Sequence, residues 1–141
     1  MQTGVQVLFA FLLMAPLTPR FDELTSVQRT EYFTTLALAG LAALLLIAPT
    51  AYHRVLFRLG DKEYLVRVGN RLTIAGLAAV GLSMVGAMLF VTGVLFGQGA
   101  ALAAGLLSAL AAVTLWGVLP VARRVALTRD NDRRGLDRSR R

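Results

Sequence analysis

The chain has 141 residues, of which 56% are hydrophobic, with a mean hydropathy of +0.63 and a formal net charge of +7. This length leaves room for one membrane domain and excludes a separate soluble catalytic domain beside it. The absence of cysteine from the sequence excludes disulfides, thiolate metal sites and cysteine nucleophiles.

Three stretches of the chain carry no charged residue: 1–19, 32–51 and 72–122. A charged side chain at bilayer depth costs roughly 2.5 kcal/mol or more, so such runs are typical of membrane spans. The third run is long enough for two crossings, because one helix needs about 20 apolar residues. The sequence therefore predicts an all-α integral membrane protein, a four-helix bundle over residues 1–122. Its spans are expected at about 2–18, 30–51, 72–96 and 100–122.

The first predicted helix ends at Pro16 and Pro19, which both disfavour helix continuation. Residues 2–17 would cover only about 24 Å, which is less than a typical bilayer core. We therefore expect either a helix that begins before Met1 or a span that is thin at one end.

The second predicted helix has a clear start signal. Thr25 followed by Gln28 is a capping-box pattern, which places the beginning of the helix near Ser26. Pro49 lies inside this helix, where a kink is expected rather than a break. We expect the helix to continue past the membrane to Leu59.

The third predicted helix begins at Lys62, after a C-cap at Gly60 and an N-cap at Asp61. Residues 97–99 read Gly-Gln-Gly and predict a tight uncharged turn before the fourth helix. The tail, residues 123–141, is charge-rich, and we expect it to be disordered.

The orientation follows from the distribution of Lys and Arg. The three connections hold two, five and none, and the tail holds eight. Positive segments stay in the cytoplasm, so both termini are predicted to be cytoplasmic in a multi-pass protein of the bacterial inner membrane. Positive charge beside a membrane favours anionic lipid over nucleic acid as a partner. The arginines expected to contact lipid are Arg54, Arg58, Arg67, Arg71, Arg123 and Arg124.

Small residues recur at helical spacing along the third and fourth helices. They let helix backbones approach closely, where packing drives association in lipid. Packing inside one bundle and a homo-oligomer interface both explain the pattern. The residues are Gly76, Ser83, Gly86, Gly93, Gly97, Ala101, Gly105 and Ser108.

Charged residues gather before and at the start of the second helix: Arg20, Asp22, Glu23 and Glu31. Interfacial capping and surface ion pairing explain such a cluster, but in an oligomer the carboxylates would form a ring that concentrates cations. Gln6 is the most polar residue of the first helix and either joins helices or lines a polar path. The uncharged runs hold no acid at depth, which counts against a self-sufficient proton antiporter.

His53 is the only histidine and lies beside Arg54. Histidine changes its charge near neutral pH, so His53 is a candidate pH sensor, the alternative being an ordinary interfacial residue. One histidine without nearby carboxylates predicts no metal site. The sequence contains no Walker, dinucleotide or HExxH motif. We therefore expect no enzymatic activity and no cofactor.

Several segments carry a family resemblance. Residues 3–13 read Thr-Gly-Val-Gln-Val-Leu-Phe-Ala-Phe-Leu-Leu, residues 20–24 Arg-Phe-Asp-Glu-Leu and residues 48–54 Ala-Pro-Thr-Ala-Tyr-His-Arg. In these segments, with 28–29 and 67–72, the chain resembles an uncharacterised family of small four-span membrane proteins found mainly in actinobacteria. Members often carry a charged helical segment before the Thr-Gly-Val-Gln stretch, which implies a chain that begins before Met1. Some are labelled sodium:proton antiporters, which implies ion transport.

Two functions are consistent with these observations. The first is a homo-oligomeric cation or proton pathway with the carboxylates at its mouth. The second is a non-conducting accessory or scaffold subunit that docks a larger membrane complex. The resemblance favours the first.

Overall fold

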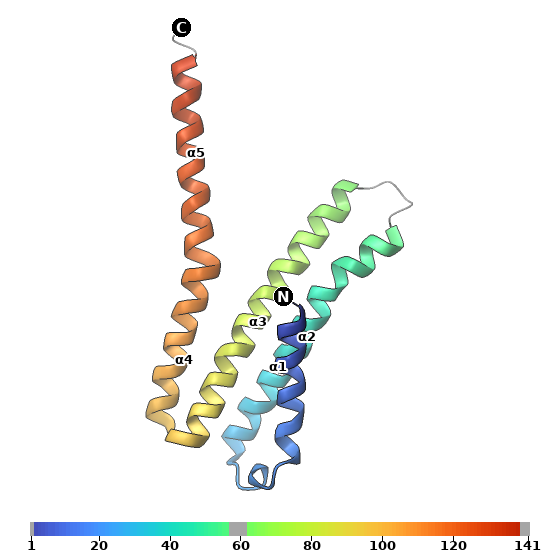
Figure 1. Ribbon diagram of the computed structural model, residues 1–141, viewed down its shortest axis with the longest axis vertical. Helices are drawn as coiled ribbons and strands as arrows, with labels where there is room; N and C mark the ends of the chain where they lie inside the picture. Colours follow the sequence, from blue (N-terminus) through green and yellow to red (C-terminus); the bar gives the residue numbers. More distant parts are fainter. Residues whose placement is uncertain (1, 57–61, 139–141) are drawn as a thin grey trace.

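The computed structural model describes residues 2–56 and 62–138, which are helical apart from short connections (Figure 1). Three segments are long and apolar enough to cross a membrane: Ser26–Val55, Glu63–Phe96 and Gln98–Thr128. These three candidate spans cover the positions of the second, third and fourth predicted spans. The first helix, α1 (Gln2–Met14), has 13 residues. These 13 residues would cover only about 20 Å, which is less than a typical bilayer core.

Helix α2 (Ser26–Leu56) begins where the capping box predicts. The Thr25 amide donates to Gln28 Oε1 at 3.0 Å, and the Gln28 amide donates to Thr25 Oγ1 at 3.3 Å. Each side chain thus satisfies a backbone N–H that has no partner within the helix. The helix runs unbroken through Pro49, as predicted. The predicted extension to Leu59, and the caps at Gly60 and Asp61, lie outside the described residues.

The connection between α1 and α2 folds into two short 3-10 turns, η1 (Ala15–Leu17) and η2 (Pro19–Phe21). Pro16 has no backbone N–H, so it cannot donate to the carbonyl of Leu12 one turn earlier. The hydroxyl of Tyr32 in α2 donates to that carbonyl instead. Tyr32 is fully buried, and this bond fixes the end of α1 against α2.

Helix α3 (Lys62–Phe96) begins at the predicted residue. It is joined to α4 (Gln98–Val113) by Gly97 alone, whose φ of +84° and ψ of 176° favour glycine strongly. The predicted turn at 97–99 is therefore confirmed and is tighter than expected. Helix α4 begins at Gln98 rather than at residue 100.

Helix α4 continues through a π turn, labelled η4 (Thr114–Val118), into α5 (Leu119–Arg138). Pro120 is the second residue after the π turn, and its ring would crowd the carbonyl of Trp116 in a regular α-helix. The tail, which was predicted to be disordered, is instead helical as far as Arg138. Extending an existing helix avoids the cost of nucleation, and the tail is rich in Arg, which favours helix.

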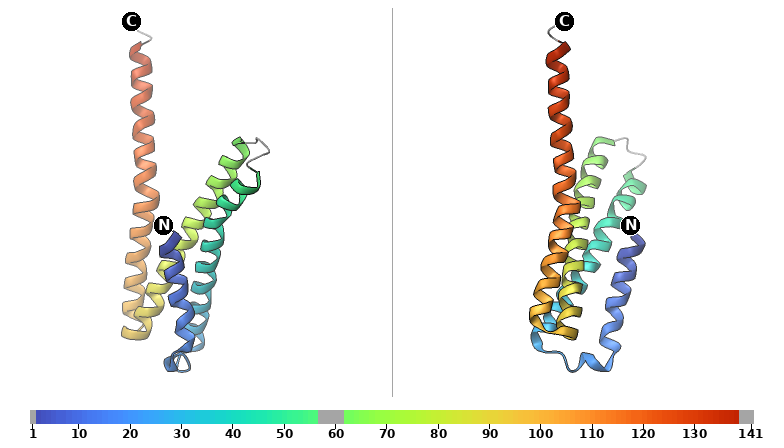
Figure 2. Two further views of the ribbon diagram at one scale, coloured as in Figure 1. Left: turned by 45° about the vertical axis from the view of Figure 1, so that its right-hand side comes forward. Right: turned by 60° about the vertical axis from the view of Figure 1, so that its left-hand side comes forward.

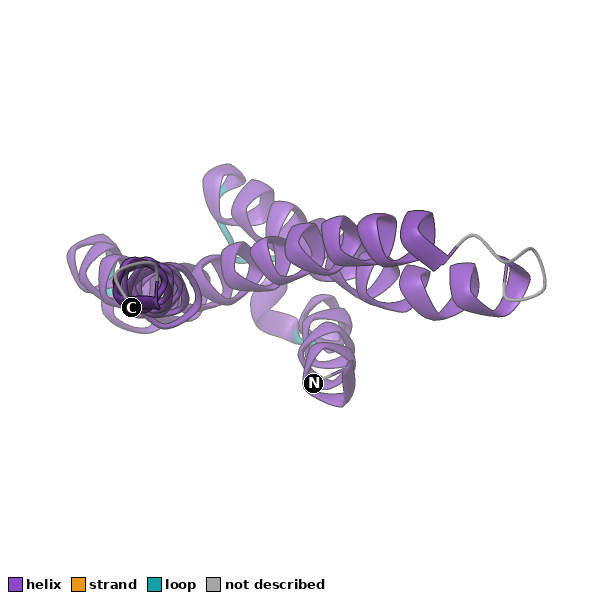
Figure 3. Ribbon diagram, turned by 90° about the horizontal axis from the view of Figure 1, so that it is seen from above, coloured by secondary structure: helices purple, strands orange, loops and turns teal. Residues whose placement is uncertain are grey.

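The helices pack in sequence order. Helix α2 lies along α3, α1 packs beside α2, and α4 packs against α3. Figures 2 and 3 show that α4 and α5 diverge from α3 with distance from Gly97, so the arrangement is open and not a closed four-helix bundle. The connection between α1 and α2 lies at the same end of the molecule as Gly97, called here the turn end. The other end, where α2 ends, α3 begins and α5 extends, is called the arginine end.

The buried core lies among α1, α2 and α3. Near the turn end, Tyr32 packs between Leu12 and Ala39, with the ring of Phe90 5.6 Å from its own. Farther along, Val5 of α1 packs with Ala42 of α2 and with the α3 residues Ala79 and Val80. This second cluster lies near the middle of α2 and α3. Figure 1 accordingly shows the N-terminus of α1 partway along these helices.

Candidate functional site

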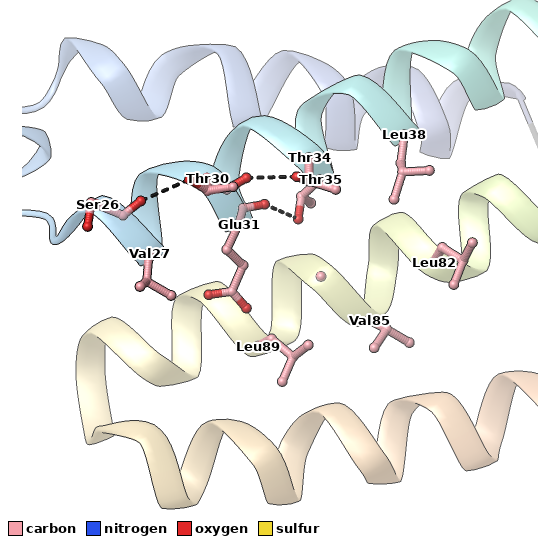
Figure 4. Close-up of a pocket in the computed structure, with 11 residues that line it drawn as sticks. Ser26, Val27, Thr30, Glu31, Thr34, Thr35, Leu38, Leu82, Val85 and Leu89 are labelled. Carbon is pink, nitrogen blue, oxygen red and sulfur yellow. Dashed lines mark hydrogen bonds between the residues drawn. The ribbon is translucent and has the colours of Figure 1, made fainter.

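An open groove of about 640 Å³ lies between α2 and α3 near the turn end (Figure 4). Five of its lining residues are polar, and all five come from the first three turns of α2. The groove is lined by Ser26, Val27, Thr30, Glu31, Thr34, Thr35, Leu38, Leu82, Val85, Gly86 and Leu89.

The hydroxyl groups of α2 form a ladder along the groove (Figure 4). Thr30 donates to the carbonyl of Ser26 at 3.0 Å, and Thr34 to the carbonyl of Thr30 at 2.8 Å. Thr35 donates in the same way to the carbonyl of Glu31 at 2.8 Å. Each hydroxyl proton is engaged with the backbone, so the exposed oxygens of Thr30 and Thr34 still have lone pairs that can accept a hydrogen bond or face a cation, whereas the Thr35 oxygen is buried against Gly86.

Glu31 is the only carboxylate that lines this groove. Its side chain is half-buried and extends from α2 across the groove toward α3 (Figure 4). Beyond the threonines the lining is apolar, with Leu38 on one side and Leu82 on the other. The arrangement is therefore an open groove in which polar side chains of α2 face an apolar wall on α3.

The groove rests on a tight contact between α2 and α3. A Cβ atom placed on Gly86 would collide with the side chain of Thr35, so only glycine allows this approach. Ser83 is fully buried one turn away and donates to the carbonyl of Thr35 at 3.4 Å. Thr35 is itself only 2% exposed. These contacts hold the polar face of α2 at a fixed distance from α3.

The other predicted mouth residues do not join Glu31 in the groove. Asp22 and Glu23 are exposed in the connection before α2, and neither lines the groove. The guanidinium of Arg29 donates to the carbonyl of Asp22 at 3.1 Å and lies over the ring of Phe21. The Arg20 side chain is outside the described part of the structure.

Gln6 is exposed on α1 and does not line the groove. Its neighbour Val5 packs on Ala42, so Gln6 lies at the level of the middle of α2. Sequence reasoning thus found Glu31 but missed the threonines that accompany it. Their signal was present as a hydroxyl at every fourth position, Ser26, Thr30 and Thr34.

The small residues of α3 and α4 mainly pack within the chain. A Cβ on Gly76 would lie 2.9 Å from Leu46 Cδ2 of α2, and one on Gly93 would lie 3.5 Å from the Cβ of Ala101. A Cβ on Gly105 would collide with Leu89. Ser108 donates to the carbonyl of Ala104 within α4 at 2.7 Å. These contacts match the packing interpretation of the small-residue pattern.

The positively charged residues lie toward the arginine end. His53 and Arg54 are exposed near the end of α2, and Arg67 and Arg71 are exposed in the first part of α3. Arg123 and Arg124 are exposed in α5, and Arg58 lies outside the described residues. Within the described residues, no group of three His, Cys, Asp or Glu side chains could hold a metal ion.

Comparison with known proteins gives one result. A family model described as a family of unknown function, DUF6328, matches residues 1–120. No curated protein and no solved structure matches the chain. The expected resemblance to an uncharacterised family is confirmed, whereas no named relative supports the antiporter label or the actinobacterial lineage. The match spans most of the sequence, and the chain therefore belongs to DUF6328, a family of unknown function.

Proposed function

We propose that this protein spans the bacterial cytoplasmic membrane and assembles as a homo-oligomer that carries cations or protons, with the Glu31 groove as the outer entrance. The observation that supports the proposal is the groove itself, where a half-buried carboxylate and a ladder of hydroxyls line one open hollow. Oxygen atoms are the ligands that hard cations prefer, and carboxylates near a pore mouth attract cations.

The charge distribution supports an orientation for this pathway. The arginine end carries Arg54, Arg67, Arg71, Arg123 and Arg124, which the positive-inside rule assigns to the cytoplasm. The Glu31 groove then opens toward the outside, and α1 and α5 both point their free ends toward the cytoplasm.

The proposal includes oligomerisation because the Glu31 groove, as the described residues line it, is not by itself a continuous polar route. The groove ends at Leu38 and Leu82, and the arrangement of helices is open. Gln6 is exposed at the level of the middle of α2, where its amide would otherwise face hydrocarbon. Packing of Gln6 against a second copy would pair this amide and continue the polar route between subunits.

Flux into proteoliposomes tests the proposal. Purified protein should conduct sodium ions or protons down an imposed gradient, and Glu31→Gln should lower that flux by roughly tenfold, because the neutral amide no longer concentrates cations at the entrance. Glu63→Gln is the matched control, since Glu63 is exposed at the other end of the molecule. An absence of flux under sodium and pH gradients would overturn the transport proposal, as would equal flux in both variants.

The surface of α4 favours a second candidate, a non-conducting scaffold subunit. Leu102, Leu106 and Leu110 recur at every fourth position of α4, and each is more than half exposed. Such a ridge can pack into the grooves of a partner helix. If the scaffold function holds, a stable complex should be purified from native membranes, and Leu106→Gln should release the partner without changing the helix content of the protein.

A further inference from the structure

A second hollow of about 510 Å³ lies between α3 and α4, beside the Glu31 groove, with which it shares Leu82 and Val85. Its lining is apolar throughout. The residues that define it are Ile74, Ala78 and Gly81 on α3 and Ala112, Trp116 and Gly117 on the facing helix.

The hollow has two structural causes. Gly81 carries no side chain, and a Cβ placed there would lie 3.3 Å from Cζ3 of Trp116. The π turn holds Trp116, and a π turn widens the helix locally and often occurs at functional sites. In addition, α5 diverges from α3 toward the arginine end (Figures 1 and 2).

Arginines follow the hollow on both helices. Arg71 lies three residues before Ile74, about 4.5 Å along α3 and on the same face. Arg124 lies seven residues after Gly117, about 10 Å farther along the helix and within α5. Both side chains are exposed. An apolar hollow is thus continued, toward one end of the molecule, by positive charge on each flanking helix.

We infer that this hollow binds an anionic phospholipid, with an acyl chain against Gly81 and Trp116 and the phosphate near Arg71 and Arg124. The inference rests on the membrane orientation proposed above. Basic pockets between membrane helices on the cytoplasmic side are suited to anionic headgroups. A neighbouring apolar helix would fill the hollow equally well, but it would not account for the two arginines aligned with it.

The single tryptophan of the chain gives a direct readout, because Trp116 lines the hollow and bromine quenches its fluorescence on contact. The protein is placed in nanodiscs of phosphatidylcholine that contain a minor fraction of either brominated phosphatidylglycerol or brominated phosphatidylcholine. Each arginine near the headgroup should favour the anionic lipid by about fivefold. Phosphatidylglycerol should therefore quench Trp116 much more strongly at equal mole fraction, and added salt should reduce the difference.

Variants separate the two parts of the site. The double variant Arg71→Gln, Arg124→Gln should lose the preference for phosphatidylglycerol, whereas Arg54→Gln on α2 should keep it. The double variant Arg71→Lys, Arg124→Lys should keep most of it, which guards against a loss caused by misfolding. Gly81→Leu should fill the hollow and lower quenching by phosphatidylglycerol while both arginines remain.

Three results would overturn the inference. These are equal quenching of the unmodified protein by the two lipids, a preference that survives loss of both arginines, and a preference unchanged by Gly81→Leu. The last result would mean that the lipid stays at the surface and does not enter the hollow. None of these outcomes depends on ion flux, so the inference and the transport proposal fail separately.

Discussion

Small residues lie at both interfaces of α3, with α2 and with α4, but they meet different side chains. Toward α2, Gly86 meets Thr35, a β-branched side chain whose hydroxyl is bonded to the backbone, and Ser83 is fully buried. Toward α4, Gly105 of the facing helix meets Leu89, a flexible side chain, and the helices then diverge around a hollow. Small residues therefore permit close approach at both interfaces, and the rigidity of the opposing side chain decides how much a larger residue would cost.

Among the substitutions that test this comparison, Gly86→Leu should cause the largest loss of stability. The new side chain cannot fit beside Thr35, whose own position is fixed, so α2 and α3 must separate and bury less surface. We expect a loss of about 3 kcal/mol in the free energy of unfolding, typical of strong overpacking. The measurement is unfolding in detergent micelles, followed by circular dichroism. Gly99→Leu is the control, since nothing lies within 4 Å of a Cβ at Gly99. A stability equal to that of the control would contradict the tight contact.

The turn between α3 and α4 should be nearly as sensitive. Gly97→Ala places a Cβ on a residue with φ of +84°, which costs about 2 kcal/mol even though the space around it is open. The same unfolding experiment with Gly99→Ala serves as the reference, because Gly99 has ordinary helical geometry. If both alanine variants are equally stable, the strain at Gly97 is absent.

The buried hydroxyl of Tyr32 should contribute somewhat less. Tyr32→Phe leaves the carbonyl of Leu12 without its donor, at an expected cost of about 1.5 kcal/mol. Tyr52→Phe, at an exposed tyrosine of the same helix, should have no effect. In a Pro16→Ala background the alanine amide can donate to Leu12, so the cost of Tyr32→Phe should fall. An undiminished cost would show that the hydroxyl stabilises the protein in another way.

The smallest effect is expected on the α4 side. Gly105→Leu displaces the flexible end of Leu89, which can rotate toward lipid, so we expect a loss of only about 1 kcal/mol. The comparison of Gly105→Leu with Gly86→Leu uses the same substitution at both interfaces and the same unfolding measurement. Equal losses at the two positions would mean that the two interfaces are equally rigid.

Local signals in the sequence predicted the elements well where the chemistry is local. The capping box of Thr25 and Gln28, the start of α3 at Lys62 and the turn at Gly97 all follow from the preferences of a few neighbouring residues. The continuation of α5 to Arg138 was missed because polar composition favoured disorder, whereas a helix already formed by α4 extends at little cost. The open packing was missed because hydrophobicity in lipid does not specify which helices touch.

The sequence likewise predicted only part of the candidate site. The sequence identified Glu31 by its charge at the start of a span, and the repeat of Ser26, Thr30 and Thr34 could have extended that prediction. It placed Asp22, Glu23 and Gln6 with Glu31, but the fold separates them from the groove. Nearness along the chain, or a shared polar character, does not show which face of a helix a side chain occupies.

The sequence alone determined that this protein is helical and apolar enough to cross a membrane, because the cost of burying charge in hydrocarbon is paid residue by residue and leaves uncharged runs. It also determined where most helices begin and turn. Only the tertiary structure decided which small residues meet which side chains, that Glu31 shares a groove with the threonines of α2, and that a hollow beside Trp116 leads toward arginines. Those features depend on how the helices are rotated and how they diverge. Many weak packing contacts between residues far apart in the sequence set this arrangement.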